Sequence, residues 1–219
     1  MKQLCKILTA CSFSLVLGIG FQDRTHAQLW DGRKALEPSF HFRVKAERAG
    51  NVVLGYRAMV RTELASFTFL IPDELKALAD QKTRRIVLVD RNSAPVVSMV
   101  FSEPPLPGEV PKEPKAADLK SFALQQEPAA KVVEEFQLSA GSFVGPAVEV
   151  EWNLGSDLRT LQSRRYLRVL AMGLGVDFQR LCTTATRTDA DRYFNSVLIT
   201  FRGADSEEKL AVAPLSDKL

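Results

Sequence analysis

Apolar and polar residues alternate along much of the chain, and this alternation predicts β-strands. Residues 40–45 read Phe-His-Phe-Arg-Val-Lys, the pattern of a half-buried strand, and Gly50-Asn51 offers a hairpin turn before a second apolar stretch that ends near residue 60. The same reasoning predicts further strands over residues 66–71, 85–90, 95–101, 131–138, 147–152, 161–171 and 177–186.

Apolar residues spaced three or four apart predict three helices. The first is short and covers residues 73–79, and the second covers residues 116–126. The third covers residues 189–201, where Phe194 and Phe201 belong to an apolar stripe with the helical period. The chain therefore mixes strands and helices, with strands in the majority.

A proline-rich segment, residues 102–115, interrupts this pattern with five prolines among charged residues. Proline has no backbone N–H and a fixed φ, so the segment is expected to form an exposed, partly extended loop. Gly203 is expected to end the last helix in a left-handed conformation, and the charged residues 204–219 are expected to form a flexible tail. Residues 28–203 are thus predicted to form a single domain.

Residues 1–27 have the organisation of a secretory signal peptide, here called the leader. Two lysines precede residues 7–21, which are 15 uncharged residues, and small residues lead up to a cleavage position near Ala27. Cleavage there predicts an extracytoplasmic protein, either periplasmic or secreted. A retained leader would instead tether the chain to a membrane, and the lipobox-like sequence ending at Cys11 offers lipidation as a third outcome.

Removal of the leader changes the charge and the cysteine content. The full chain has 29 Lys and Arg and 26 Asp and Glu, and without residues 1–27 these numbers become 26 and 25. A net charge of +1 gives no reason to expect a nucleic-acid partner. Cys182 is then the only cysteine, so the domain has no intramolecular disulfide, and we expect this thiol to be a small buried side chain.

The sequence offers no recognisable catalytic, cofactor or metal site. His41 is the only histidine after the leader, and it lies on an alternating strand beside basic residues. No nucleophile motif accompanies it, and the chain has too few Cys and His residues for a zinc site. An enzymatic role is therefore not the leading hypothesis.

Five residues of two neighbouring strands form a candidate binding surface. If these strands pair as a hairpin, Glu149 and Glu151 are expected to share one face with Arg164, Tyr166 and Arg168. The planar guanidinium of arginine suits an anionic ligand or an acidic partner surface. Alternatively, the opposite charges pair with one another on a solvated face. The two glutamates also have a spacing compatible with acid–base chemistry on a sugar, but neighbouring arginines would keep both ionised.

Several segments, taken in order, resemble PsbP-like domains, whose fold is shared with a Ran-binding family. The resemblance covers about residues 62–202 and implies an α+β fold, an antiparallel β-sheet with helices packed on both faces in an α/β/α sandwich. Known members dock to other proteins and have no shared catalytic centre, and no functional residue can be transferred position by position. The segments that carry the resemblance are Phe-Thr-Phe-Leu-Ile-Pro at 67–72, Gly-Ser-Phe-Val-Gly-Pro-Ala at 141–147, Arg-Tyr-Leu-Arg-Val-Leu at 165–170, Leu-Cys-Thr-Thr-Ala-Thr at 181–186 and Phe-Arg at 201–202.

These observations lead to one main functional hypothesis and two alternatives. The main hypothesis is a non-catalytic, extracytoplasmic protein-binding or assembly module that contacts another envelope or secreted protein. It would use a sheet face or the loop at residues 102–115 for this contact. The alternatives are an extracytoplasmic enzyme with a dispersed active site, and a structural envelope component tethered by residues 7–21.

Overall fold

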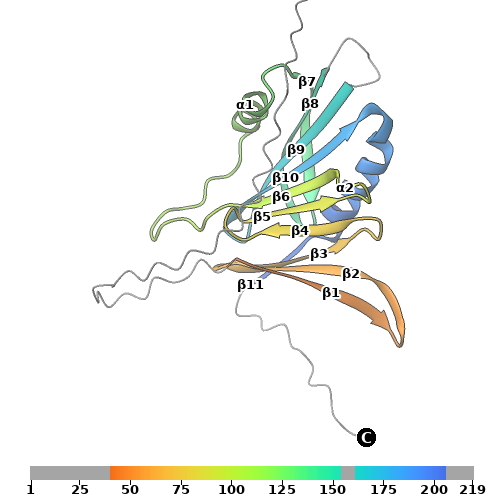
Figure 1. Ribbon diagram of the computed structural model, residues 1–219. Helices are drawn as coiled ribbons and strands as arrows, with labels where there is room; N and C mark the ends of the chain where they lie inside the picture. The colour runs from red at the N-terminus through yellow and green to blue at the C-terminus, as the bar shows by residue number, and fades with distance from the viewer. Residues whose placement is uncertain (1–39, 154–160, 206–219) are drawn as a thin grey trace, which may run out of the picture. The chain divides into compact units, whose positions relative to one another are not determined.

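The computed structural model describes residues 40–153 and 161–205. Within these ranges the chain forms two antiparallel β-sheets and two α-helices (Figure 1). The smaller sheet has four strands in the order β1 (His41–Ala49), β2 (Val52–Arg61), β3 (Ala65–Ile71) and β11 (Arg202–Asp205).

The larger sheet has seven strands within the same described ranges, and every neighbouring pair is antiparallel. The earliest strand of this sheet, β4, lies at one edge and β7 at the other, and near the centre β6 pairs with the much later β10. The order is β4 (Lys76–Asp80), β5 (Arg85–Val89), β6 (Pro95–Phe101), β10 (Leu174–Thr183), β9 (Leu161–Ala171), β8 (Phe143–Asn153) and β7 (Lys131–Ala140).

The two helices belong to different clusters of buried side chains. Helix α1 (Ala116–Gln126) packs its buried Leu119 and Ala123 against a small cluster that includes Val148 and Tyr166. Helix α2 (Arg187–Thr200) follows a short 3-10 helix and packs into the main core. Neighbouring residues of a strand point to opposite faces, so β8 and β9 serve both clusters at once.

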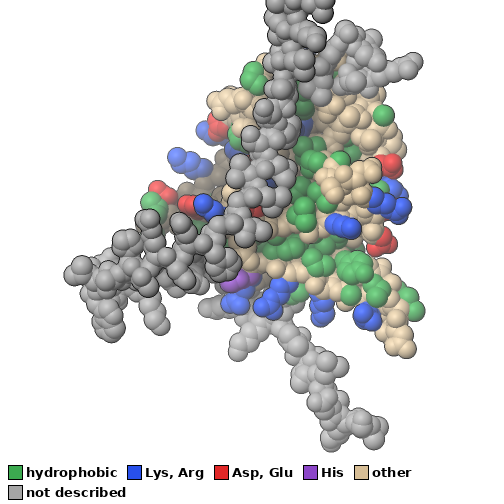
Figure 2. Space-filling model, in the orientation of Figure 1, with side chains coloured by type: hydrophobic (Ala, Val, Ile, Leu, Met, Phe, Trp, Pro, Cys, Tyr) green, Lys and Arg blue, Asp and Glu red, His purple; other side chains and the backbone are tan. Residues whose placement is uncertain are grey.

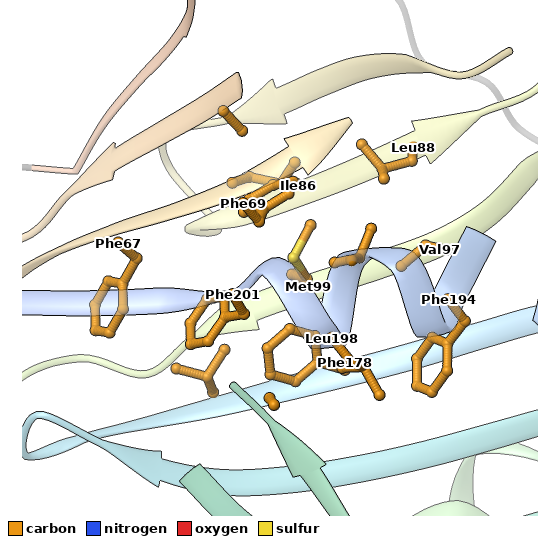
Figure 3. Close-up of a cluster of buried hydrophobic side chains, with 14 of the residues drawn as sticks. Phe67, Phe69, Ile86, Leu88, Val97, Met99, Phe178, Phe194, Leu198 and Phe201 are labelled. Atoms are coloured by element: carbon orange, nitrogen blue, oxygen red, sulfur yellow. The ribbon is translucent and has the colours of Figure 1, made fainter. Parts of the chain in front are cut away.

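The main core joins both sheets and α2 (Figure 3). Phe67 from β3 and Phe178 from β10 both lie against Phe201, at the end of α2, with ring centroids 5.4 and 5.1 Å away. Burying a phenylalanine side chain stabilises a fold by about 1.5–3 kcal/mol. This shared packing makes the two sheets parts of one folded unit.

The structure confirms most predicted elements and the α+β class, in a form that is mostly antiparallel β. It confirms the helix at residues 116–126, and it places the last helix at Arg187–Thr200, close to the predicted 189–201. The finer expectation, an α/β/α sandwich with helices packed on both faces, is not confirmed. The smaller sheet closes part of the main core, so only one described helix, α2, packs against that core.

The predicted helix at residues 73–79 is wrong. Residues Lys76–Asp80 form β4, an edge strand whose backbone pairs with β5. Leu75 is buried, but Leu78, expected on the same helical face, is exposed. The three-residue spacing of these leucines matches a helical period by coincidence, and pairing with the next strand, β5, determines the conformation.

The predicted role of Gly203 is also wrong, because this residue lies in β11 opposite Phe67 of β3. A Cβ atom at this position would come within 2.9 Å of the Met172 side chain and 3.1 Å of the Phe143 ring. Glycine at this position leaves room for the Met172 and Phe143 side chains, and it does not serve as a helix cap.

Two predictions concern residues that the structure does not describe. The leader, residues 1–27, lies outside the described residues, as does most of the predicted tail at 204–219. The first two tail residues lie in β11. In the described part of the chain, neither α-helix has the length and apolar character needed to cross a membrane.

Candidate functional site

The predicted binding residues lie on two opposite faces of the larger sheet, so the expectation of one shared face is wrong. In the pairing of β8 with β9, Glu149 lies opposite Arg165, while Val150 lies opposite Arg164. Directly opposed residues point to the same face, and the next residue along points to the other. Glu149 and Glu151 therefore face α2, whereas Arg164, Tyr166 and Arg168 face α1.

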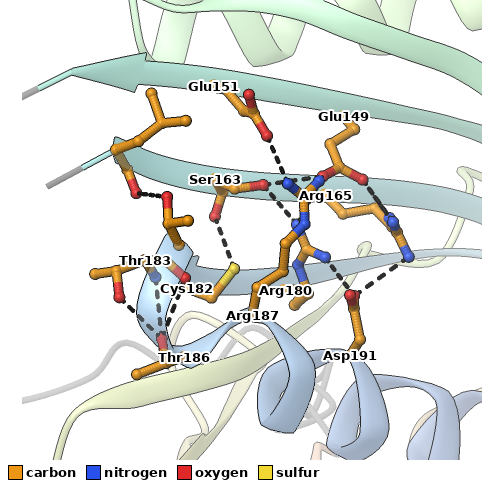
Figure 4. Close-up of polar contacts among 12 residues, drawn as sticks. Glu149, Glu151, Ser163, Arg165, Arg180, Cys182, Thr183, Thr186, Arg187 and Asp191 are labelled. Carbon is orange, nitrogen blue, oxygen red and sulfur yellow. Dashed lines mark hydrogen bonds and ion pairs between the residues drawn. The ribbon is translucent and has the colours of Figure 1, made fainter. Parts of the chain in front are cut away.

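Glu149 is the centre of a buried network of charged side chains (Figure 4). Its carboxylate accepts hydrogen bonds from the Ser163 hydroxyl at 3.0 Å, the Arg165 Nε at 2.9 Å and the Arg180 Nη2 at 3.0 Å. Arg187, at the start of α2, donates to the same carboxylate. These contacts connect three strands of the sheet with the helix.

Two further carboxylates complete this network, here called the arginine–glutamate cluster. Asp191 pairs with Arg180 and lies 3.5 Å from Arg165, and Glu151 accepts a hydrogen bond of 2.8 Å from Arg187. Three arginines thus meet three carboxylates, and their formal charges cancel. Arg180 is fully buried, and its Nε has no hydrogen-bond partner in the structure.

The charges around Glu149 disfavour a role as a proton donor at neutral pH. Burial alone would raise its pKa, but the hydrogen bond from Arg165 and the positive charges of Arg180 and Arg165 lower this pKa from 4.5 to about 2. A carboxylate with this pKa stays ionised. The arrangement supports the ion-pair interpretation of Glu149 and Glu151 over acid–base catalysis on a sugar.

Acid should therefore destabilise the protein through Glu149. Its folded-state pKa lies below the unfolded value, so its contribution is complete above pH 4.5 and is lost as the pH falls toward 2. The expected loss is about 3 kcal/mol of unfolding free energy. Urea denaturation across this pH range measures it, with Glu149→Gln as the control. An equally steep loss in that variant would contradict the assignment.

Sequence reasoning missed Ser163, Arg180, Arg187 and Asp191 as members of this cluster. Arg180 did carry a signal, because it occupies a position of β10 that otherwise alternates as a buried apolar residue. A charged residue in such a position predicts a buried partner of opposite charge. The identity of that partner depends on strand pairing, which the local sequence does not specify.

On the opposite face, Tyr166 is buried beneath α1. Its ring meets Phe122 edge to face at 5.9 Å, and burial raises the pKa of its hydroxyl. Arg164 donates a hydrogen bond of 3.2 Å to this hydroxyl, pairs with Glu127 at 2.8 Å and covers the Trp152 ring. These contacts fix the position of α1 on the sheet.

Arg168 is the predicted residue that borders an open groove. Its guanidinium makes two hydrogen bonds to Asp177, of 2.6 and 2.7 Å, and this pairing raises its pKa. The groove has a volume of about 380 Å³ and lies between the β9–β10 hairpin, the start of α1 and the proline-rich loop. Residues lining it include Ser102, Pro105, Pro111, Lys115, Arg168 and Asp177.

The proline-rich loop, residues 102–115, contains no helix or strand. The loop is attached to the sheet at its start, where the Ser102 N–H donates to the Gly175 carbonyl and the Gly175 N–H donates to the Ser102 hydroxyl, both at 2.9 Å. Beyond this attachment, Leu106 and Val110 are 68% and 84% exposed. An anchored loop thus presents two apolar side chains to solvent.

Cys182 and His41, the other two residues considered as candidates, lie in different environments. Cys182 is buried as predicted, and burial raises the pKa of its thiol, which lowers its nucleophilicity. His41 is exposed on β1. Among the described side chains, no group of three or more His, Cys, Asp and Glu is placed to hold a metal ion.

Comparison with known proteins finds similarity of fold without similarity of sequence. No protein-family model matches the chain, and no curated protein matches it. The structure is similar to cyanobacterial PsbP (CyanoP) from Synechocystis, with 13% identity and a TM-score of 0.46 over 74% of this chain and 91% of that chain.

Two further solved structures show similarity of the same order. LpqN, involved in cell envelope biogenesis of Mycobacterium tuberculosis, has 13% identity and a TM-score of 0.42 over 75% of this chain and 92% of that chain. A Bacteroides thetaiotaomicron protein has 9% identity and a TM-score of 0.40 over 65% of this chain and 46% of that chain. The resemblance to PsbP-like domains that the sequence indicates is confirmed as a weak match of fold over most of the chain.

Proposed function

We propose that the protein is an extracytoplasmic, non-catalytic module that binds another envelope or secreted protein. The observation that carries this proposal is the anchored proline-rich loop, with Leu106 and Val110 exposed beside a groove. Exposed apolar side chains on a fixed loop are typical of a contact surface. The extracytoplasmic location rests on the signal-like sequence of residues 1–27.

The loop is suited to binding because much of its conformational freedom is already lost. Its prolines fix φ, and the hydrogen bonds between Ser102 and Gly175 hold its start against the sheet. Binding therefore requires less additional ordering than binding by a free loop would. The groove beneath has both acidic and basic side chains on its walls, which suits a polypeptide better than a single small ion.

The predicted binding residues take different parts in this proposal. Arg168 borders the groove and would contact the partner, and Arg164 would support α1 beside it. Glu151 is accessible only on the other face, near α2. Glu149 and Tyr166 are buried, so they would act by holding the strands and α1 in place.

A pull-down from an envelope extract tests the proposal. The exported protein is expected to retain a stoichiometric partner, and Leu106→Asp with Val110→Asp should reduce its recovery at least about tenfold, because two charges would enter an apolar contact. Arg164→Ala with Arg168→Ala should also weaken the partner's binding. Quantitative mass spectrometry of the retained proteins provides the measurement.

The matched control is Leu78→Asp, which changes an exposed leucine on the edge strand β4, away from the groove. This variant should retain the partner, and thermal melting of all variants separates lost contacts from lost folding. Recovery of no partner, or equal recovery with the loop variant, would disprove docking through this loop. Either result would favour one of the two alternative roles, an extracytoplasmic enzyme or a structural envelope component tethered to a membrane.

A further inference from the structure

The hairpin formed by β1 and β2, residues 41–61 and here called the arm, extends beyond the rest of its sheet. β1 is the edge strand, and β2 pairs with β3 only from Tyr56 to Arg61. Residues 47–55 therefore pair only with one another, across the turn at Gly50. In Figure 1 the arm ends away from the helices and from the larger sheet.

The end of the arm, residues 49–54 and here called the tip, is apolar on both faces. Val52, Val53 and Leu54 are consecutive, and their exposed fractions are 63%, 40% and 65%. Consecutive residues of a strand point to opposite faces, so apolar side chains project on both sides of the hairpin. A protein surface docking on one face would leave the other apolar face in water, whereas an apolar medium would surround both.

Behind the tip, the arm carries a concentration of positive charge. Residues 41–61 contain five Lys and Arg and one Glu, a formal charge of +4, although the whole chain has only +3. The one glutamate, Glu47, pairs with Arg57. Figure 2 shows basic side chains in a row where the arm lies, with hydrophobic side chains beside them. The exposed basic residues are Arg43, Lys45, Arg48 and Arg61.

We propose that the arm binds an anionic phospholipid bilayer, with the tip inserted among the acyl chains and the basic residues at the headgroups. The apolar tip lies at the end of the arm and the basic residues lie behind it, which is the order that insertion into a membrane surface requires. Hairpin pairing satisfies the backbone groups of the tip that face the opposite strand, while Leu54 lies at a bulge and the outer edges are open. The insertion is therefore shallow, with side chains among the acyl chains and the open backbone edges at the headgroup level. This binding is separate from the groove and requires no retained leader.

Charge complementarity selects the anionic bilayer over a second copy of the arm. Antiparallel pairing of two β1 edges about Val44 would place Arg43 of each copy opposite Lys45 of the other, and like charges in adjacent strands destabilise a sheet. Negatively charged headgroups instead attract these residues. The same basic residues thus disfavour pairing with a second arm and favour binding to anionic lipid.

Vesicle sedimentation tests this proposal with the exported chain, its N-terminus determined by mass spectrometry. Binding to vesicles of phosphatidylglycerol and phosphatidylcholine should exceed binding to pure phosphatidylcholine at least about tenfold, and added salt should weaken it. Val52→Asp with Leu54→Asp should reduce binding to the anionic vesicles by a similar factor. Arg43→Gln with Lys45→Gln should remove most of the preference for anionic lipid.

The control is Val133→Asp with Val144→Asp, which changes two exposed valines on β7 and β8, the last two strands at the other end of the larger sheet. This variant should bind vesicles as the unchanged protein does. Absence of binding to anionic vesicles, or full binding by the tip variant, would overturn the proposal. A tip variant that binds vesicles normally but loses a protein from the envelope pull-down would assign the arm to a protein partner instead, and this also overturns it.

Discussion

Replacing Phe201 with alanine should destabilise the protein by about 3–5 kcal/mol. Its ring is fully buried where α2 meets β11, and it stacks on Phe67 of the smaller sheet while meeting Phe178 of the larger sheet edge to face. Removing it creates a cavity between the sheets, which the rigid strands around it cannot fill. Urea denaturation at neutral pH measures the change in unfolding free energy.

Two other residues of α2 calibrate this expectation. Phe194 is also fully buried, and Phe194→Ala should have an effect of the same size. Ile199 is 69% exposed on the same helix, so Ile199→Ala should change the stability by no more than about 0.5 kcal/mol. Equal stabilities for the Phe201 and Ile199 variants would show that the helix does not join the two sheets.

Replacing Glu149 with alanine should have a comparable cost, about 3–5 kcal/mol. The substitution leaves Arg180 fully buried with only Asp191 to balance it, and removes an acceptor from Arg165 and Arg187. An unbalanced charge in a buried site costs far more than the original ion pairs contributed. Thermal and urea denaturation of the purified variant measure this effect.

Glu151→Ala is the matched control on the same strand. Glu151 is partly exposed and pairs with Arg187 near the surface, so its loss should cost no more than about 1 kcal/mol. Similar losses in the two variants would mean that Glu149 is no more important than a surface charge. The arginine–glutamate cluster would then contribute little to holding α2 against the sheet.

Local periodicity was enough to predict most strands and both described α-helices, because their buried faces follow periods of two and of about 3.6. It failed at β4, where a leucine spacing typical of a helix lies in an edge strand that pairs with β5. It also gave no sign that the strands divide between two sheets. That division depends on contacts between Phe67, Phe178 and Phe201, which lie far apart in the sequence.

For the candidate site too, the sequence predicts what depends on local pattern and not what depends on strand pairing. The sequence correctly placed opposite charges on two neighbouring strands, but the registry pairs Glu149 with Arg165 and not with Arg164. A shift of one residue in registry moves every side chain to the other face. The buried partners Arg180 and Arg187 come from β10 and α2, and only the folded chain brings them to Glu149.

The position of β11 along the chain has a consequence for the order of folding. β11 completes the smaller sheet beside β3, and it follows all other described elements in the sequence. The sheet and the core around Phe201 therefore cannot close until residue 205 has emerged from the ribosome. Until that moment β3 lacks its last partner, so the chain remains open during synthesis, the state in which chaperones bind polypeptides.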